Sequence, residues 1–260
     1  MHPAFRSESA ARAARRRGRY WLAPGRAFAR GSLRAAAALA ACAALASCGE
    51  RDALSAAAAS EAGAPASASA PQRPVVLFVG TSLTAGYGLG EDEAFPARIQ
   101  ERIDDLGLDL EVVNAGVSGD TSAGGLRRID WLLRLPVAVL VLELGANDML
   151  RGLDVDAMRA NLAEILARTR RAHPDARLVV AGMRAAPNLG PDYGRRFDAA
   201  FPALAREFGA TLVPFLLDGV AASRKLNQAD GIHPTAEGHR VIAERLWPVL
   251  EPVLREAAIR

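Results

Sequence analysis

Apolar residues are gathered into five short continuous runs between residues 75 and 215, separated by segments in which they fall at helical intervals. Short apolar runs bounded by turn residues are typical of strands buried on both faces of a sheet. The third run is the most apolar and is expected at the centre of the sheet. The predicted strands are Val75–Gly80, Leu110–Gly116, Val137–Gly145, Arg177–Met183 and Thr211–Phe215.

The intervening segments predict helices over Glu93–Leu106, Thr121–Leu135, Val155–Ala172, Gly194–Phe208 and Thr235–Ala257. Asp120 or Thr121 is suited to cap the second helix, and Pro248 is expected to interrupt the last one. Strands that alternate with helices predict the α/β class, as a three-layer α/β/α sandwich around a five-stranded parallel sheet. Active sites of such sheets lie beyond the carboxyl ends of the strands.

The first 74 residues lack this alternation. Residues 1–48 are predicted to be a signal peptide, because an Arg-rich segment precedes the apolar run Ala35–Ala46, which is too short to span a bilayer. The run ends in Leu-Ala-Ser-Cys48, which resembles the lipobox of bacterial lipoproteins; a plain signal peptide is the alternative. Residues 49–74 are mostly Ala, Ser and Pro and are expected to form a disordered linker to a single domain at 75–260.

The net charge of +3 conceals an asymmetry between the leader and the rest of the chain. Residues 1–48 contain nine Arg and one Glu, which leaves 23 Lys and Arg against 28 Asp and Glu in the remainder. Without the leader no basic footprint is left, so a nucleic-acid partner is not expected. Cys42 and Cys48 both lie in the leader, so the domain is expected to lack disulfides, a cysteine nucleophile and thiolate metal sites.

A glycine-rich turn, GTSLTAGYGL, begins at Gly80 after the first predicted strand. It lacks both the Lys-Ser/Thr pair of nucleoside-triphosphate loops and the glycine spacing of dinucleotide sites. Ser82 in this turn would instead lie at a strand end near a helix N-terminus, where backbone N–H groups favour a developing negative charge.

Three later segments carry further candidates. Gly119 in NAGVSGDTSAGGL would let the backbone approach a ligand, and the Asn147 amide in ELGANDMLRG can donate to an oxyanion. A simple tight turn and a helix cap are the structural alternatives for these two, and Asp148 is expected to be structural. In DGIHP, Asp230 lies three residues before His233 and can accept from its Nδ1–H, which leaves Nε2 as a base.

These four blocks, in this order, resemble the SGNH (GDSL-like) hydrolases over residues 75–255, and within them the bacterial thioesterase I/lysophospholipase/arylesterase group. The resemblance implies the flavodoxin-like fold of that family. It implies that Ser82 is the nucleophile and His233 the general acid and base, oriented by Asp230. It also implies an oxyanion hole made of the Ser82 N–H, the Gly119 N–H and the Asn147 amide.

The resemblance further implies that the loop after the fourth strand, Arg184–Gly190 with Pro187, borders an acyl pocket, and that Leu150 and Tyr193 belong to its wall. Ordinary core packing is the alternative for each of them. One residue departs from the family: Thr81 stands where the family has an aspartate before the serine. Hydrogen bonding around the turn is therefore expected to differ.

The predicted function is hydrolysis of small carboxylic esters or thioesters through an acyl-serine intermediate, without metal or cofactor. The protein is expected to be an exported monomer on the periplasmic side of a bacterial membrane, anchored through Cys48, or otherwise soluble in the periplasm. A carbohydrate O-acetylesterase of the cell envelope is one alternative. A non-catalytic lipoprotein binding module is another, although a binder would not need all five site residues.

The lipobox gives a direct test. If Cys48 is lipidated, the protein should partition with membranes and incorporate labelled palmitate, since several acyl chains give firm attachment where one gives little. The Cys48→Ser variant should lose the label. Wild-type protein that is processed, unlabelled and soluble would contradict lipidation.

Overall fold

Within residues 73–259, which the computed structural model describes, five parallel strands form one sheet. The predicted signal peptide, the predicted lipobox with Cys48 and the predicted linker up to residue 72 lie outside these described residues. The strand order β2-β1-β3-β4-β5 is that of a flavodoxin-like sheet, and β3 is central, as the apolar pattern predicts. The strands are β1 (Val75–Gly80), β2 (Glu111–Gly116), β3 (Val137–Glu143), β4 (Arg177–Ala181) and β5 (Thr211–Val213).

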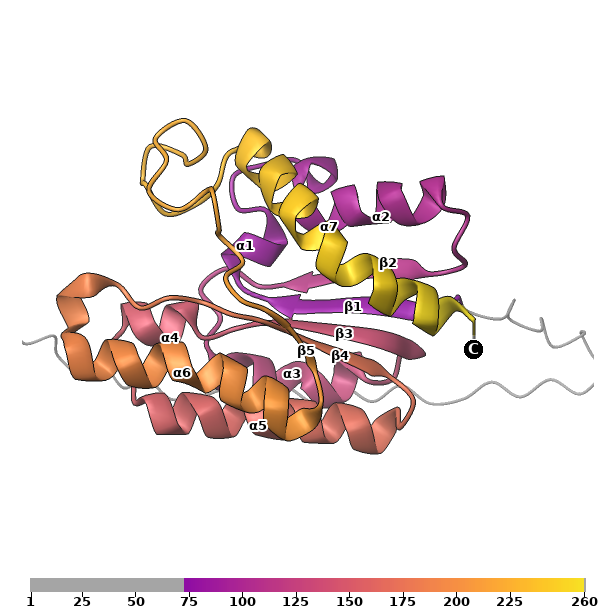
Figure 1. Ribbon diagram of the computed structural model, residues 1–260, viewed down its shortest axis with the longest axis horizontal. Coiled ribbons are helices and arrows are strands. Elements are labelled where there is room, and N and C mark those ends of the chain that lie inside the picture. Colours follow the sequence, from indigo (N-terminus) through magenta and orange to yellow (C-terminus); the bar gives the residue numbers. More distant parts are fainter. Residues whose placement is uncertain (1–72, 260) are drawn as a thin grey trace, which may run out of the picture. The chain divides into compact units, whose positions relative to one another are not determined.

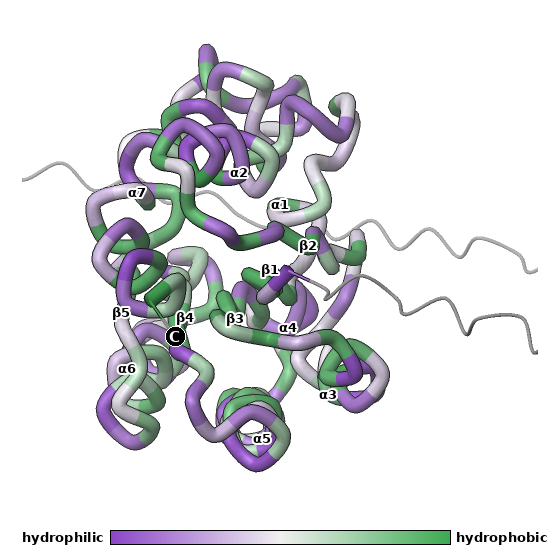
Figure 2. The backbone as a smooth tube through the Cα atoms, turned by 90° about the vertical axis from the view of Figure 1, so that its right-hand side faces the viewer, coloured by the Kyte–Doolittle hydropathy of each residue, from purple (hydrophilic) through white to green (hydrophobic). Residues whose placement is uncertain are grey.

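Helices cover both faces of the sheet, which confirms the three-layer α/β/α arrangement (Figure 1). Helices α2 (Phe95–Asp105) and α7 (Ala236–Ala258) pack together on one face. Helices α3 (Ser122–Leu132), α5 (Val155–Ala172) and α6 (Pro191–Phe208) cover the other. In Figure 2 the strands between these helices are among the most hydrophobic parts of the chain, in keeping with the complete burial of β1.

Two short helices and two 3₁₀ turns follow strand ends or precede helices, and sequence periodicity does not predict them. The short helices are α1 (Ser82–Ala85), directly after β1, and α4 (Ala146–Leu150), shortly after β3. The 3₁₀ turns are η1 (Glu91–Glu93) and η2 (Pro187–Leu189). A helix of four or five residues is too short to show an apolar period.

The predicted interruption of the last helix at Pro248 is wrong. Helix α7 runs unbroken through both Pro248 and Pro252. A proline inside a helix costs about 3 kcal/mol, through a lost hydrogen bond and a clash with the preceding turn. Burial of apolar residues such as Leu246 and Leu250 on either side of Pro248 offsets that cost, at roughly 1.5–3 kcal/mol each.

The ends of the elements confirm one predicted cap, and the first described residue already bonds the rest of the domain. Thr121 is the N-cap of α3, and its side chain accepts a hydrogen bond from the Gly124 N–H. Arg73, which the sequence assigns to the linker, already contacts the domain, because its Nε donates to Asp109 Oδ1 at 2.9 Å. Among residues 73–259, no helix is long and apolar enough to cross a membrane.

Candidate active site

Three side chains predicted from the sequence form one hydrogen-bonded chain at the carboxyl edge of the sheet. The Ser82 Oγ lies 2.9 Å from Nε2 of His233, and Nδ1 of the same ring lies 2.6 Å from Asp230 Oδ2. Ser82 is the first residue of α1, whereas the other two lie in the loop before α7, about 150 residues later. With Nδ1–H donated to the carboxylate, Nε2 is free to accept the serine proton.

Asp230 is held in place by its own turn. Its Oδ1 accepts from the N–H groups of Ile232 and His233, at 2.9 and 3.0 Å, while its Oδ2 faces the imidazole. The hydrogen bond from the His233 side chain is the main cause that lowers the pKa of Asp230 to about 2, with the two backbone N–H groups acting in the same direction. The carboxylate is therefore ionised throughout the neutral range.

Two residues that the sequence reasoning missed fix the histidine loop against the serine turn. The Tyr87 ring lies against the imidazole of His233, with 4.5 Å between ring centroids. Gln228 Nε2 donates both to Tyr87 O and to Pro234 O, at 2.7 and 3.0 Å. Gln228 thus joins the segment after β1 to the segment before α7, and no local sequence motif marks that role.

Three groups predicted to hold an oxyanion border the same cavity as Ser82 and His233. The Ser82 N–H belongs to the first turn of α1, where backbone N–H groups have no acceptor within the helix. Gly119 has a positive φ of 80°, which favours glycine, in the loop between β2 and α3. Asn147 donates one amide hydrogen to Asp120 O at 2.8 Å, which orients the side chain and leaves the second hydrogen for a ligand.

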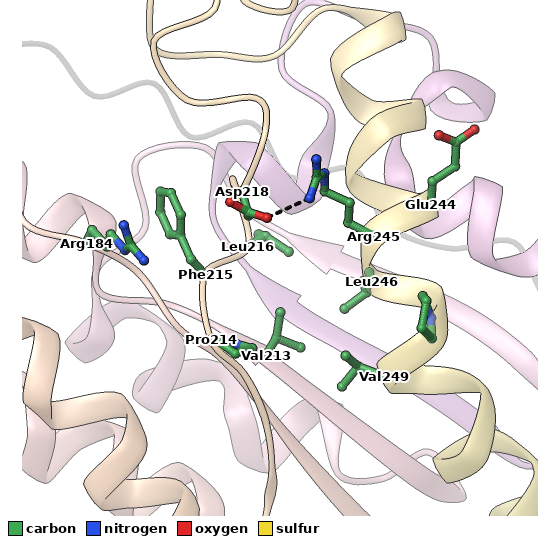
Figure 3. A pocket seen from close by; sticks show the side chains of 11 residues that line it. Arg184, Val213, Pro214, Phe215, Leu216, Asp218, Glu244, Arg245, Leu246 and Val249 are labelled. Atoms are coloured by element: carbon green, nitrogen blue, oxygen red, sulfur yellow. Dashed lines mark hydrogen bonds and ion pairs between the residues drawn. The ribbon is translucent and has the colours of Figure 1, made fainter.

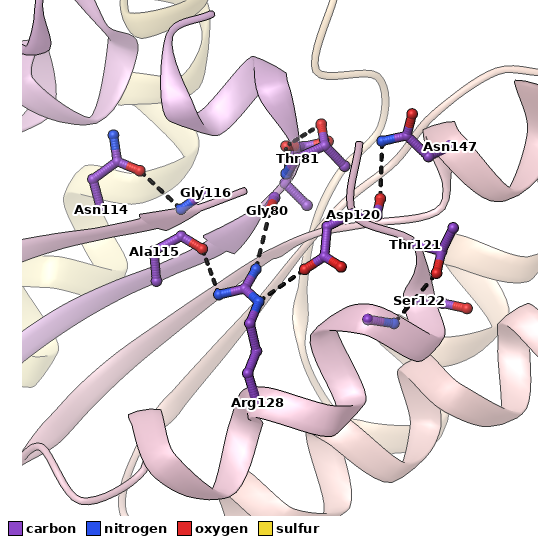
Figure 4. A network of polar contacts seen from close by, with 12 residues as sticks. Gly80, Thr81, Asn114, Ala115, Gly116, Asp120, Thr121, Ser122, Arg128 and Asn147 are labelled. Atoms are coloured by element: carbon purple, nitrogen blue, oxygen red, sulfur yellow. Dashed lines mark hydrogen bonds and ion pairs between the residues drawn. The ribbon is translucent and has the colours of Figure 1, made fainter. Parts of the chain in front are cut away.

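Arg128 of α3 connects the strand ends beneath these groups (Figure 4). Its guanidinium donates to Gly80 O at 3.2 Å, to Ala115 O at 2.6 Å and to Asp120 Oδ2 at 2.8 Å. One side chain therefore holds the last residue of β1, the end of β2 and the residue after Gly119. The sequence gives no signal for this role, since an arginine on an amphipathic helix usually faces solvent.

The cavity has a volume of about 500 Å³ and a largely apolar wall. Leu150 lines it, as the family resemblance implies. Pro187 and Tyr193 are not among its lining residues: the Tyr193 hydroxyl donates to Leu153 O, and its ring stacks on Phe197. Other apolar lining residues are Leu83, Met149, Met183, Phe215, Leu217 and Ile232.

A second cavity of about 580 Å³ adjoins the first, between the segment after β5 and helix α7 (Figure 3). Arg184 and Phe215 border both cavities, and the guanidinium lies 4.9 Å from the ring centroid. None of the residues that line the second cavity is a serine, cysteine or histidine. Of these two adjoining cavities, the one that Ser82 borders therefore holds the serine and histidine.

Two buried ionisable side chains outside the hydrogen-bonded chain have structural contacts. Asp148 is buried and accepts from the N–H and the hydroxyl of Ser122, in agreement with its expected structural role. His239 is buried, accepts from the Phe95 N–H at 3.0 Å, and has its pKa lowered to about 4 by burial. Within residues 73–259 no cluster of three or more histidine, cysteine or acidic side chains is placed to hold a metal ion.

Comparison with known proteins gives one family. Residues 78–241 match the model of the GDSL-like lipase/acylhydrolase family. The esterase TesA of Pseudomonas aeruginosa is 41% identical over 180 residues, which are 69% of this chain and 89% of that protein. The thioesterase 1/protease 1/lysophospholipase L1 of Escherichia coli is 36% identical over 181 residues, covering 69% of this chain and 84% of that protein.

Solved structures agree with the sequence relatives. A crystal structure of TesA, 40% identical, matches with a TM-score of 0.66 over 69% of this chain and 99% of its own length. The psychrotrophic esterase EstA from a Pseudoalteromonas species, solved with monoethylphosphonate as inhibitor, is 31% identical and also has a TM-score of 0.66. That match covers 70% of this chain and 98% of EstA.

The contacts of Arg128 predict a loss of rate without a loss of binding. In Arg128→Lys, one ammonium cannot replace three guanidinium hydrogen bonds, so the Ser82 turn and the Gly119 loop should shift against each other. Because small misplacements near a reacting centre can cost up to about a hundredfold, kcat on a soluble ester should fall at least about tenfold with KM nearly unchanged. Arg168→Lys is the matched control, because Arg168 of α5 is also half-buried and bonds Asp130 and Glu164 but does not line the cavity. Equal kcat for both variants would contradict the role of Arg128.

Proposed function

Because the chain belongs to the GDSL-like lipase/acylhydrolase family, we propose that Ser82 is the nucleophile, His233 the general acid and base, and Asp230 the residue that orients it. The protein is a serine hydrolase of carboxylic esters or thioesters. The observation that carries the proposed roles is the hydrogen-bonded chain of these three side chains, which opens into the cavity that Gly119 and Asn147 also border.

In the first half of the reaction, Ser82 Oγ attacks the carbonyl carbon while His233 Nε2 takes its proton. The carbonyl oxygen becomes an oxyanion, held by the N–H groups of Ser82 and Gly119 and by the free amide hydrogen of Asn147. When the tetrahedral intermediate collapses, the bond to the alcohol or thiol breaks. His233 returns the proton to that leaving group, and the acyl group stays on Ser82.

In the second half, water takes the place of the leaving group. His233 removes a proton from the water as it attacks the acyl-serine carbonyl, and the oxyanion forms again in the same hole. Collapse then breaks the bond to Ser82 Oγ, which recovers its proton from His233 and releases the carboxylic acid. The ionised Asp230 stabilises the imidazolium in both halves.

The apolar wall supports an acyl or aryl group of some size as the substrate part bound next to Ser82. Leu150, Met183 and Phe215 offer an aliphatic and aromatic surface in a cavity of about 500 Å³. An acetyl group would leave most of that surface uncovered. This favours larger acyl esters and thioesters over the carbohydrate O-acetylesterase alternative, and hydrolysis of a chain-length series of p-nitrophenyl esters separates the two.

The leader supports the proposal that the enzyme works outside the cytoplasm. Its Arg-rich segment, its apolar run and the lipobox ending at Cys48 together favour export and lipid anchoring of the domain at the membrane surface. The charge balance of the remaining chain gives no support for a nucleic-acid partner.

Removal of the nucleophile is the first test. Ser82→Ala loses only one hydroxyl and should keep the fold, but kcat should fall on the order of 10⁶-fold, as for other nucleophiles that act as a unit with their base. Circular dichroism and thermal melting would verify the fold, and hydrolysis of a p-nitrophenyl ester would give the rate. A folded variant that retained a tenth of the wild-type kcat would rule out Ser82 as nucleophile.

The role of Asn147 is tested by measuring whether its removal changes kcat or KM. The Asn147 hydrogen bond should strengthen mainly in the transition state, so Asn147→Ala should lower kcat by about 10²–10³-fold with little change in KM. Asn161→Ala is a matched control, because Asn161 also donates its amide to a nearby oxygen, the Ser122 hydroxyl, but does not line the cavity. A rise in KM alone for Asn147→Ala would assign Asn147 to ground-state binding.

A further inference from the structure

Glu143, the last residue of β3, is a buried carboxylate that the reaction described above does not use. Only 1% of the residue is exposed. Within the described part of the chain no cationic side chain forms an ion pair or hydrogen bond with it. Burial of a carboxylate raises the free energy of the folded state unless hydrogen bonds satisfy its oxygens. The hydrogen bonds that Glu143 accepts are therefore important for the fold.

The contacts of Glu143 all come from the turn that carries Ser82. Its Oε2 accepts from the Thr81 N–H at 2.8 Å and from the Thr84 hydroxyl at 2.7 Å. The Thr81 hydroxyl lies 3.1 Å from both carboxylate oxygens, and the same hydroxyl accepts from the Leu83 N–H at 3.3 Å as the N-cap of α1. One carboxylate therefore fixes the residues on either side of Ser82.

Close packing at the end of β1 makes this cluster possible. A Cβ on Gly80 would lie 2.0 Å from the Thr84 Oγ1 and 2.6 Å from Glu143 Oε2. Any larger residue at this position would force the carboxylate and the hydroxyl apart. Gly80 is thus needed for the approach of Glu143 to the serine turn, in addition to ending the strand.

We propose that Glu143 is a positioning residue for the reaction: its ionised carboxylate, acting through Thr81 and Thr84, holds Ser82 in the geometry that His233 and the oxyanion require. The proposal rests on the proposed role of Ser82 as nucleophile. It also gives a purpose to Thr81. A hydroxyl both donates and accepts, so it can bind Glu143 and cap α1 at once, which an ionised aspartate at the same place cannot do.

The ionised form of Glu143 matches this cluster better than the protonated form. With a carboxylate, Thr81 and Thr84 each donate one hydroxyl hydrogen, and Thr81 still accepts from Leu83. A proton on Glu143 adds a donor, so one of the two hydroxyls has to turn its own hydrogen away. Burial raises the pKa of Glu143 to about 7, against the lowering effect of its hydrogen bonds, so both forms are populated near neutral pH.

Other ionisable groups at this end of the sheet are engaged elsewhere. Arg128 of α3 bonds the Gly80 carbonyl and Asp120, His233 of the loop before α7 bonds Ser82 and Asp230, and His239 of α7 accepts from Phe95. None of them contacts Glu143. Its ionisation is therefore governed by burial and by the two threonines.

The experiment compares Thr81→Val, which keeps the shape and loses the hydroxyl, with Thr81→Ser, which keeps the hydroxyl. kcat and KM are measured on one soluble p-nitrophenyl ester. The active-site concentration needed for kcat is determined by titration with a phosphonate. Thr81→Val should lower kcat at least about tenfold with KM nearly unchanged, because the serine is displaced rather than the substrate. Thr81→Ser should restore most of kcat.

Thr169→Val is the matched control, since Thr169 is equally buried and its hydroxyl donates to Ile165 O within α5. It should lower the melting temperature without changing kcat. Glu143→Gln provides a second test of the proposal, which does not depend on whether Thr81→Val folds. The amide keeps the shape of the protonated acid and cannot ionise, so kcat should fall even at alkaline pH.

The pH profile separates positioning from simple stabilisation. In wild type, the rise of kcat/KM with pH should include the ionisation of Glu143, whose pKa is raised by burial. Glu143→Gln lacks this ionisation, so its kcat/KM should rise less steeply with pH. An unchanged slope in Glu143→Gln, or equal kcat for Thr81→Val and Thr81→Ser, would overturn the role of Glu143. Full phosphonate titration of wild type together with an inactive Ser82→Ala would leave the nucleophile assignment standing in that case.

Discussion

The hydrogen bond between Ser82 and His233 is the contact on which the arrangement of the site depends, because it joins the first turn of the domain to its last loop. The sheet order makes the contact demanding. Strand β5 lies at one edge of the sheet, separated from β1 by β3 and β4, so the segment after β5 has to cross back over the carboxyl edge. Gln228, which bonds Tyr87 O, and the Tyr87 ring on His233 hold that returning segment in place.

Charged side chains under the reacting groups hold the other parts of the site. Arg128 reaches the ends of β1 and β2 from α3, and Glu143 reaches the Ser82 turn from β3. Both act on backbone and hydroxyl groups that must already point correctly before a substrate arrives. Such preorganisation is the main source of transition-state stabilisation in sites of this kind, because no reorganisation is needed during the reaction.

The sequence predicts the parts of this protein that depend on local pattern. Apolar runs predict all five strands and the central place of β3, and the spacing of Asp230 and His233 predicts their contact. The continuity of α7 through Pro248 was not predictable in this way, since it depends on tertiary burial on both sides of the proline.

Long-range polar contacts were likewise beyond the sequence pattern. Thr81 signals altered hydrogen bonding, but its partner Glu143 lies 62 positions away. One feature of the sequence points to a special role of Glu143: it is an acidic residue at the end of an otherwise apolar strand. The pocket wall agrees with the expectation in part. Leu150 lines the cavity, and so does Arg184 from the loop expected to border it. Pro187 and Tyr193 do not line it, and the Tyr193 hydroxyl donates to Leu153 O.

The proposed reaction requires that Ser82 forms the covalent intermediate in this cavity. The most direct measurement is mass spectrometry of the wild-type enzyme after reaction with a p-nitrophenyl phosphonate, with the released nitrophenol counted per protein. We expect one equivalent of nitrophenol and one phosphonyl group on the peptide that contains Ser82. A label on Ser118, the other serine that borders the cavity, or ester turnover by an unlabelled enzyme in excess phosphonate, would contradict it.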